Sequence, residues 1–223
     1  MRTEQLRACL KSEVRVSNNA KERLERLREE QEINLLKHQA MNSLLSPHFI
    51  FNSLNSIRAL VDVNPERARR AITELSNLLR SSMQNEKLQL VPLRQEMDII
   101  RDYLALETIR FEDRLQVELN VADDTLDLPI PPMMLQTLVE NAIKHGISTR
   151  VNGGWVRIHS VRQEGNHILE VANSGYLNSA VITAGFGLSS TQNRLQLLFG
   201  NKARLSIRQG EKEVVLCSVT IPI

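Results

Sequence analysis

The hydrophobic period of this chain changes near residue 114, and the change separates a helical part from a mixed part. Before it, apolar residues recur every three or four positions, as they do in helices that bury one stripe. After it, Leu115, Val117, Leu119 and Val121 alternate with polar residues, which is typical of a half-buried strand. We therefore predict an α+β fold in which helices precede a sheet.

The helical part starts with a segment that has no proline or glycine before Pro47 and is rich in Glu, Arg, Lys and Leu. Over residues 1–35 this pattern fits either a coiled-coil lead-in or a solvated helix. Asn64 and Pro65 are typical of an N-cap and the first helical position. Two amphipathic helices joined there, within residues 36–91, should lie antiparallel, and two such hairpins would form a dimeric four-helix bundle.

A third helix is predicted within residues 92–114, and residues 115–223 follow as a mixed domain. Prolines at 129, 131 and 132 precede a helix that carries Glu140 and Asn141. The run Glu164-Gly165-Asn166 predicts a hairpin turn between two alternating strands. Strands and helices in this order indicate an antiparallel-rich α/β layer rather than a doubly wound sheet.

The composition excludes several classes of protein. A net charge of +2 gives no electrostatic reason to expect nucleic acid as a partner. No run of about 18 apolar residues and no signal-peptide pattern is present. Cys9 and Cys217 lie far apart, which favours inert thiols in a reducing compartment, and the five histidines form no metal-binding cluster.

Two groups of residues in the mixed part predict where a polyphosphate would bind. Asn141, Lys144 and His145 share a helix face at i, i+3 and i+4 spacing. An Asn oxygen can coordinate Mg²⁺, and Lys and His can meet phosphate oxygens, although a plain polar surface is the competing interpretation. Gly185 and Gly187 precede a helix, where the backbone can approach phosphate closely and offers free N–H groups.

A histidine in the helical part is a candidate nucleophile. His48 shares a helix face with Asn52 and Asn55, so that its neighbours on that face are polar. This suits an exposed imidazole that attacks a γ-phosphate, although His48 taken alone is better explained as a surface histidine without function. Arg194, in the helix that follows Gly187, faces either phosphate or solvent.

Four motifs, in order along residues 36–223, resemble those of the LytS-type sensor histidine kinases. They are Pro47-His48-Phe49-Ile50-Phe51-Asn52; Tyr103-Leu104-Ala105-Leu106-Glu107 with Arg110-Phe111; Ile130-Pro131-Pro132-Met133-Met134-Leu135-Gln136 with Val139-Glu140-Asn141-Ala142; and Gly185-Phe186-Gly187-Leu188 with Asn193-Arg194-Leu195. Any one of them could occur by chance, but four in the same order are specific.

The resemblance implies a dimerisation and phosphoacceptor domain over residues 36–91, a linker helix over 92–114 and a Bergerat-type α/β sandwich that binds ATP over 115–223. It implies autophosphorylation of His48 from ATP and Mg²⁺, then transfer to an aspartate of a response regulator of the LytTR class. Asn52 would serve an accompanying phosphatase activity, or would only hydrogen-bond within the bundle or cap the bend at Pro47. The chain would be the cytoplasmic portion of a sensor anchored in the inner membrane and would act as a homodimer.

The resemblance also assigns roles within the nucleotide site. The family motifs place the following residues there: Asn141 on Mg²⁺, Lys144 and His145 near the phosphates, Asn173 and Gly175 at the adenine, and Gly185, Gly187, Leu188 and Arg194 around the lid and phosphate loop. Asn173 stands where the family has an Asp, which removes a charge from the contact with the adenine amino group. Phe49 stands where the commoner histidine kinases have an acidic residue, so the group that takes the proton of His48 is open.

Two rival interpretations remain at this point. A dimeric signalling scaffold could keep the fold with a degenerate ATP site, as Asn173 and the short segment between Gly175 and Gly185 suggest. An ATPase or Ser/Thr kinase of the same superfamily would leave the helix that carries His48 without a role.

Overall fold

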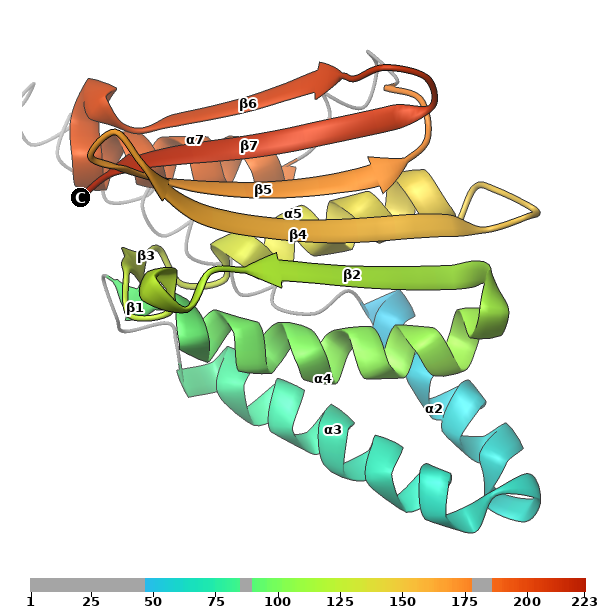
Figure 1. Cartoon of the computed structure of the whole chain (residues 1–223). Coiled ribbons are helices and arrows are strands. Elements are labelled where there is room, and N and C mark those ends of the chain that lie inside the picture. The colour runs from blue at the N-terminus through green and yellow to red at the C-terminus, as the bar shows by residue number, and fades with distance from the viewer. Residues whose placement is uncertain (1–46, 85–89, 178–185) are drawn as a thin grey trace, which may run out of the picture. The chain divides into compact units, whose positions relative to one another are not determined.

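The computed structural model describes residues 47–84, 90–177 and 186–223, all within one compact unit, Leu44–Ile223. The predicted lead-in over residues 1–35, together with Cys9 and Gly185, lies outside the described residues. In chain order the elements are α2 (Pro47–Val63), α3 (Pro65–Gln84), β1 (Val91–Pro92), α4 (Leu93–Phe111), η2 (Glu112–Arg114), β2 (Leu115–Val121), η3 (Asp123–Thr125), β3 (Pro129–Ile130), α5 (Met134–Ala142), η4 (Ile143–Ile147), β4 (Gly154–Gln163), β5 (Asn166–Ser174), α7 (Phe186–Phe199), η5 (Gly200–Lys202), β6 (Arg204–Gln209) and β7 (Val214–Pro222) (Figure 1).

Helices α2 and α3 form the predicted hairpin, with Asn64 as the one residue between them. The side-chain Oδ1 of Asn64 accepts a hydrogen bond from the backbone N–H of Arg67 at 3.0 Å, which confirms the predicted N-cap. Apolar residues at helical spacing, among them Ile57 on α2 and Leu75 on α3, are buried in the core. Helix α4 packs against both helices of the hairpin and also against α5. It therefore connects the hairpin to the mixed part of the chain.

The sheet has five strands in the order β2-β4-β5-β7-β6. Only β2 and β4 pair in parallel, and the other neighbours are antiparallel, as the sequence pattern predicts. The turn between β4 and β5 has positive φ at both Glu164 (51°) and Gly165 (73°). This combination suits the twist of a two-residue hairpin. A second, two-stranded sheet pairs β1 with β3, which the sequence did not predict.

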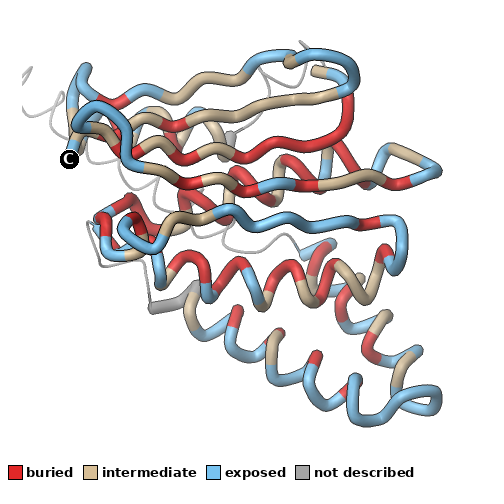
Figure 2. Tube along the Cα trace, viewed as in Figure 1, coloured by how far each residue is buried: buried red, intermediate tan, exposed pale blue. Residues whose placement is uncertain are grey.

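Helices α5 and α7 lie against one face of the five-stranded sheet (Figure 1). The buried side chains lie mainly along α4, α5 and the central strands, whereas β2 is largely exposed (Figure 2). Alternate residues of β5 point into the layer beneath the helices, among them His167, Leu169 and Val171. The arrangement confirms the predicted order of a helical hairpin followed by an α/β layer. None of the described helices has the length and apolar character needed to cross a membrane.

Candidate functional site

A cavity of about 470 Å³ lies between the C-terminal end of α5 and the face of β5, β7 and β6 that the helices cover. Its walls are mostly apolar, with a few amide and imidazole groups, as is typical of small-molecule sites. The lining residues are Leu138, Asn141, Ala142, His145, Thr149, Arg150, Val171, Asn173, Gly175, Tyr176, Leu177, Leu188, Ile207, Val215 and Cys217. Segments that are far apart in the sequence thus meet at one hollow.

Asn141 and His145 reach the cavity from α5 and the π-helical turn η4. The Asn141 Nδ2 donates to the carbonyl of Thr137 at 2.9 Å, so its Oδ1 is the atom available to a ligand. Burial and the neighbouring charge of Lys144 lower the pKa of His145, which keeps the imidazole neutral at pH 7. The helix therefore presents a neutral oxygen acceptor and a neutral imidazole to the cavity.

Asn173 lies at the end of β5 in a closely packed corner. Its Nδ2 donates to the carbonyl of Ser174 at 3.0 Å, which leaves Oδ1 as the acceptor toward the cavity. A Cβ on Gly146 would collide with the Asn173 side chain, so only glycine allows η4 to approach β5 so closely. Gly175 has φ of 149°, a conformation that side chains disfavour. The corner thus holds the Asn173 amide in one orientation.

The hairpin between β6 and β7 fixes the next wall of the cavity. The carboxylate of Glu213 accepts a hydrogen bond from the Tyr176 hydroxyl at 2.8 Å and forms an ion pair with Arg150 at 2.6 Å. The backbone N–H of Gly175 donates to the carbonyl of Glu213 at 2.8 Å. These contacts tie the segment after β5 to the hairpin turn, so the cavity keeps its shape on this side.

Several predicted site residues do not line the cavity. Lys144 is exposed, beside His145. Gly187 lies at the start of α7, where an added Cβ would come within 3.0 Å of the Thr137 side chain. Arg194 is half-buried and donates to the carbonyl of Pro132, so its guanidinium is committed to the start of α5. Of the residues named for the site, Asn141, His145, Asn173, Gly175 and Leu188 come together there.

Several residues of the cavity wall were not predicted from the sequence. Cys217 lies on the inward face of β7 and lines the cavity, and burial raises the pKa of its thiol to about 12. The thiol is therefore protonated, and it serves as an apolar surface. The alternation of β7 places Val215 on the same face. That alternation was a signal in the sequence, but without the strand order nothing linked these residues to Asn141.

His48 lies exposed near the start of α2, with Asn52 one turn later. The Nδ2 of Asn52 is 3.1 Å from His48 Nδ1 and 3.3 Å from Nε2, so the amide lies against the imidazole ring. The polar face predicted for His48 is therefore a real contact between the two side chains. The ring remains accessible to a second reactant.

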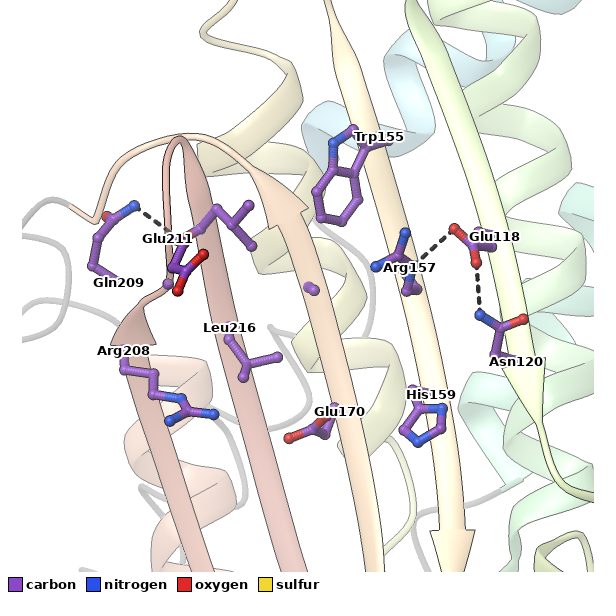
Figure 3. A pocket seen from close by; sticks show the side chains of 13 residues that line it. Glu118, Asn120, Trp155, Arg157, His159, Glu170, Arg208, Gln209, Glu211 and Leu216 are labelled. Carbon is purple, nitrogen blue, oxygen red and sulfur yellow. Dashed lines mark hydrogen bonds and ion pairs between the residues drawn. The ribbon is translucent and has the colours of Figure 1, made fainter.

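A second, larger hollow of about 960 Å³ lies on the opposite face of the sheet (Figure 3). Two of its charged groups, Glu118 and Arg157, are paired with each other. Arg157 forms an ion pair with Glu118 at 2.8 Å and lies 5.0 Å from the centre of the Trp155 ring, and Glu118 also accepts from Asn120 at 2.7 Å. This exposed sheet surface gives less reason to expect a ligand than the enclosed cavity does.

Comparison with known proteins gives consistent matches. A family model described as histidine kinase matches residues 36–115. The sensor histidine kinase/phosphatase LytS of Staphylococcus aureus, strain Mu50, is 35% identical over 193 residues, which cover 79% of this chain and 33% of that protein. LytS from the N315 strain matches to the same extent. The chain thus spans about a third of the length of the curated relatives that it matches.

Solved structures show a similar fold. A structure described as a bacterial phosphotransferase aligns over 85% of this chain and 96% of its own, with a TM-score of 0.50 and 13% identity. At that identity the likeness concerns the fold alone. The family match over the helical part, the curated relatives and the motif order together show that this chain belongs to the histidine kinase family, among the LytS-type sensor histidine kinases.

Proposed function

We propose that this protein is an ATP-dependent protein-histidine kinase that phosphorylates itself on His48. The observation that carries the proposal is the convergence of Asn141, His145, Asn173 and Gly175 on one enclosed cavity, together with an exposed histidine on a separate helix. A nucleotide site and an acceptor side chain are the two parts that such a transfer requires. We propose the division into an acceptor hairpin over residues 36–91, a linker helix over 92–114 and a nucleotide-binding domain over 115–223 on the same grounds.

The cavity suits an adenine nucleotide. Its apolar walls would enclose the base, and the Asn173 Oδ1 would accept a hydrogen bond from the exocyclic amino group. The Asn173 Nδ2 already donates to the Ser174 carbonyl, and its Oδ1, as an acceptor, suits the amino group of adenine better than the O6 carbonyl of guanine. Asn141 Oδ1 would be a ligand of Mg²⁺, a cation that prefers oxygen donors and neutralises charge on the phosphates. Lys144 and Gly187, which lie outside the cavity lining, would approach the phosphates from there.

In the transfer of the γ-phosphoryl group to His48, the protein takes little part in the covalent chemistry. The unprotonated ring nitrogen of His48 attacks the γ-phosphorus, the bond to the β-γ bridging oxygen breaks, and ADP leaves as the ring gives up its proton. The phosphoryl group then passes to an aspartate of a response regulator, which we propose to be of the LytTR class. Positioning and charge neutralisation supply most of the rate.

The acceptor hairpin has an apolar surface that suits a second copy of the chain. Phe51, Leu54 and Val61 on α2, with Ile72 on α3, each expose half or more of their surface. Such exposed apolar residues on two helices fit the predicted dimeric four-helix bundle. We propose that the protein acts as a homodimer and as the cytoplasmic portion of a membrane-anchored sensor.

We also propose that Asn52 supports a phosphatase activity toward the regulator. Its amide lies against the His48 ring, so it could orient a water molecule toward an aspartyl phosphate docked at the same place. The relative LytS is described as a sensor histidine kinase/phosphatase, which supports this second activity.

The test is incubation with γ-labelled ATP and Mg²⁺. We expect acid-labile, base-stable label on the wild-type protein and none on the His48→Gln variant. An unlabelled wild-type protein that still folds and dimerises would instead support a signalling scaffold. Acid-stable label would indicate transfer to a hydroxyl group.

A further inference from the structure

The residue directly after the acceptor histidine is anchored in the core. Phe49 is only 6% exposed, whereas His48 is exposed. The ring of Phe49 stacks on that of Tyr103 in α4, with centroids 4.9 Å apart and an angle of 30° between the planes. Tyr103 is itself 4% exposed. Offset stacking of this kind is an attractive and directional contact between buried rings.

The anchor at Phe49 controls the direction of His48. Consecutive residues of an α-helix are separated by about 100° around the axis. A buried ring on one side of α2 therefore fixes the angle at which the preceding imidazole leaves the helix. The position has no charge, so Phe49 cannot take a proton from His48, and its contribution must come through packing.

Tyr103 connects this anchor to the helix of the nucleotide site. Its hydroxyl is hydrogen-bonded to the carboxylate of Glu107, which forms an ion pair with Arg110 at 3.4 Å. The charge of Glu107 acts on Glu140 of α5, the residue directly before Asn141. The Phe49–Tyr103 stack thus joins α2 to α4, and α4 packs against α5, the helix that lines the cavity.

We propose that Phe49 is a positioning residue for phosphoryl transfer: its stack on Tyr103 sets the rotation of α2 about its axis and so orients His48 relative to the nucleotide site. The inference rests on the proposed kinase function and adds a role for the residue that replaces the usual acidic neighbour. It requires that loss of the stack slow the transfer step while nucleotide binding stays intact.

The experiment measures the autophosphorylation rate of the full chain as a function of ATP concentration. Phe49→Leu and Tyr103→Leu each remove one ring from the stack but keep an apolar side chain. We expect each to lower kcat about tenfold or more, because small misplacements of reacting groups have effects of this order. The KM for ATP should stay close to that of the wild type. The double variant should be no slower than either single variant, because the stack is lost already.

Two further variants separate positioning from packing. Phe111→Leu replaces another buried phenylalanine, 6% exposed, at the far end of α4, and should leave kcat unchanged even if the melting temperature falls. Tyr103→Phe keeps the ring and should restore most of the rate that Tyr103→Leu loses.

The outcomes are distinct. A labelled wild type with unchanged kcat in Phe49→Leu would overturn the positioning role and leave the kinase proposal in place. Multiplicative effects of the two leucine variants, or a loss of kcat in Phe111→Leu of the same size, would also overturn it. An unlabelled wild type would overturn the kinase function and the positioning role together.

Discussion

The carboxylate of Glu96 on α4 accepts a hydrogen bond of 2.7 Å from the backbone N–H of Met133, the residue that precedes α5. Met133 has a left-handed backbone, with φ of 62°, and provides no side-chain cap of its own. A residue remote in sequence therefore caps the helix that presents Asn141 to the cavity. Negative charge near a helix N-terminus is favourable, but here it is buried.

The burial of Glu96 predicts a pH-dependent stability. Burial raises its pKa from 4.5 to about 7, so the folded state holds the proton more tightly than the unfolded state does. The stabilising contribution is complete below pH 4.5 and is lost as the pH rises through 7. We expect Glu96→Gln to match the wild type within about 1 kcal/mol at pH 5 and to be more stable by about 1–3 kcal/mol at pH 8.5. Chemical denaturation at the two pH values measures this difference, and a constant difference would contradict it.

The buried His167 predicts the opposite trend. Its Nε2 lies 2.8 Å from the Ser160 hydroxyl, which donates to Thr125, so the ring must donate from Nε2. Its Nδ1 has no hydrogen-bond partner among the described residues, and burial lowers the pKa of His167 from 6.5 to about 4. Stability is therefore lost as the pH falls from 6.5 to 4. Relative to His167→Gln, the wild type should lose about 1–3 kcal/mol over that range in equilibrium denaturation. Parallel pH profiles would show that His167 does not titrate on unfolding.

Asn141→Ala and Asn141→Asp should abolish Mg-ATP-dependent phosphorylation of His48. The first removes both the oxygen ligand and the amide donor to Thr137, and the second keeps an oxygen but loses that donor and adds a negative charge beside the phosphates. Both variants should remain folded, because Asn141 is only half-buried. Labelling, with circular dichroism as the folding control, checks this prediction. Asn152, exposed in the loop before β4, offers a matched substitution, Asn152→Ala, that should retain full activity.

Asn52→Ala should keep the autophosphorylation of His48 but slow dephosphorylation of the regulator, by about tenfold or more if the amide orients the attacking water. Decay of the phosphorylated regulator in the presence of each variant measures the effect. Asn55→Ala, on an exposed position of the same helix, is the control. If Asn52→Ala loses both activities together, the amide serves the helix or the imidazole rather than the phosphatase reaction.

Much of the fold was predictable because local spacing determined it. The periods of about 3.6 and 2 located the helices and strands, and Asn64 with Pro65 located the start of α3. The parallel pairing of β2 with β4 and the short pairing of β1 with β3 were not predictable. They depend on contacts between segments remote in sequence, which no local pattern specifies.

The candidate site was predicted less completely, for a reason visible at η4. The i, i+3, i+4 spacing of Asn141, Lys144 and His145 predicts a shared face only in a regular α-helix. Here the backbone N–H of Ser148 donates to the carbonyl of Ile143, which makes a wider i to i+5 turn. His145 lines the cavity together with Asn141, whereas Lys144 is exposed and does not. Arg194 donates to the carbonyl of Pro132, and no local pattern predicts that the segment before α5 lies beside α7.

The junction at Asn64 has a mechanical consequence for the acceptor hairpin. The backbone hydrogen bonds continue across it, from Asn64 N–H to the Leu60 carbonyl at 2.8 Å and from Ala68 N–H to the Asn64 carbonyl at 3.0 Å. A single residue joins the two helices, and both its backbone N–H and its carbonyl are hydrogen-bonded, so the connection is rigid. A rotation of α2 about its axis would be transmitted directly to α3, so that the two helices would move together in response to a signal.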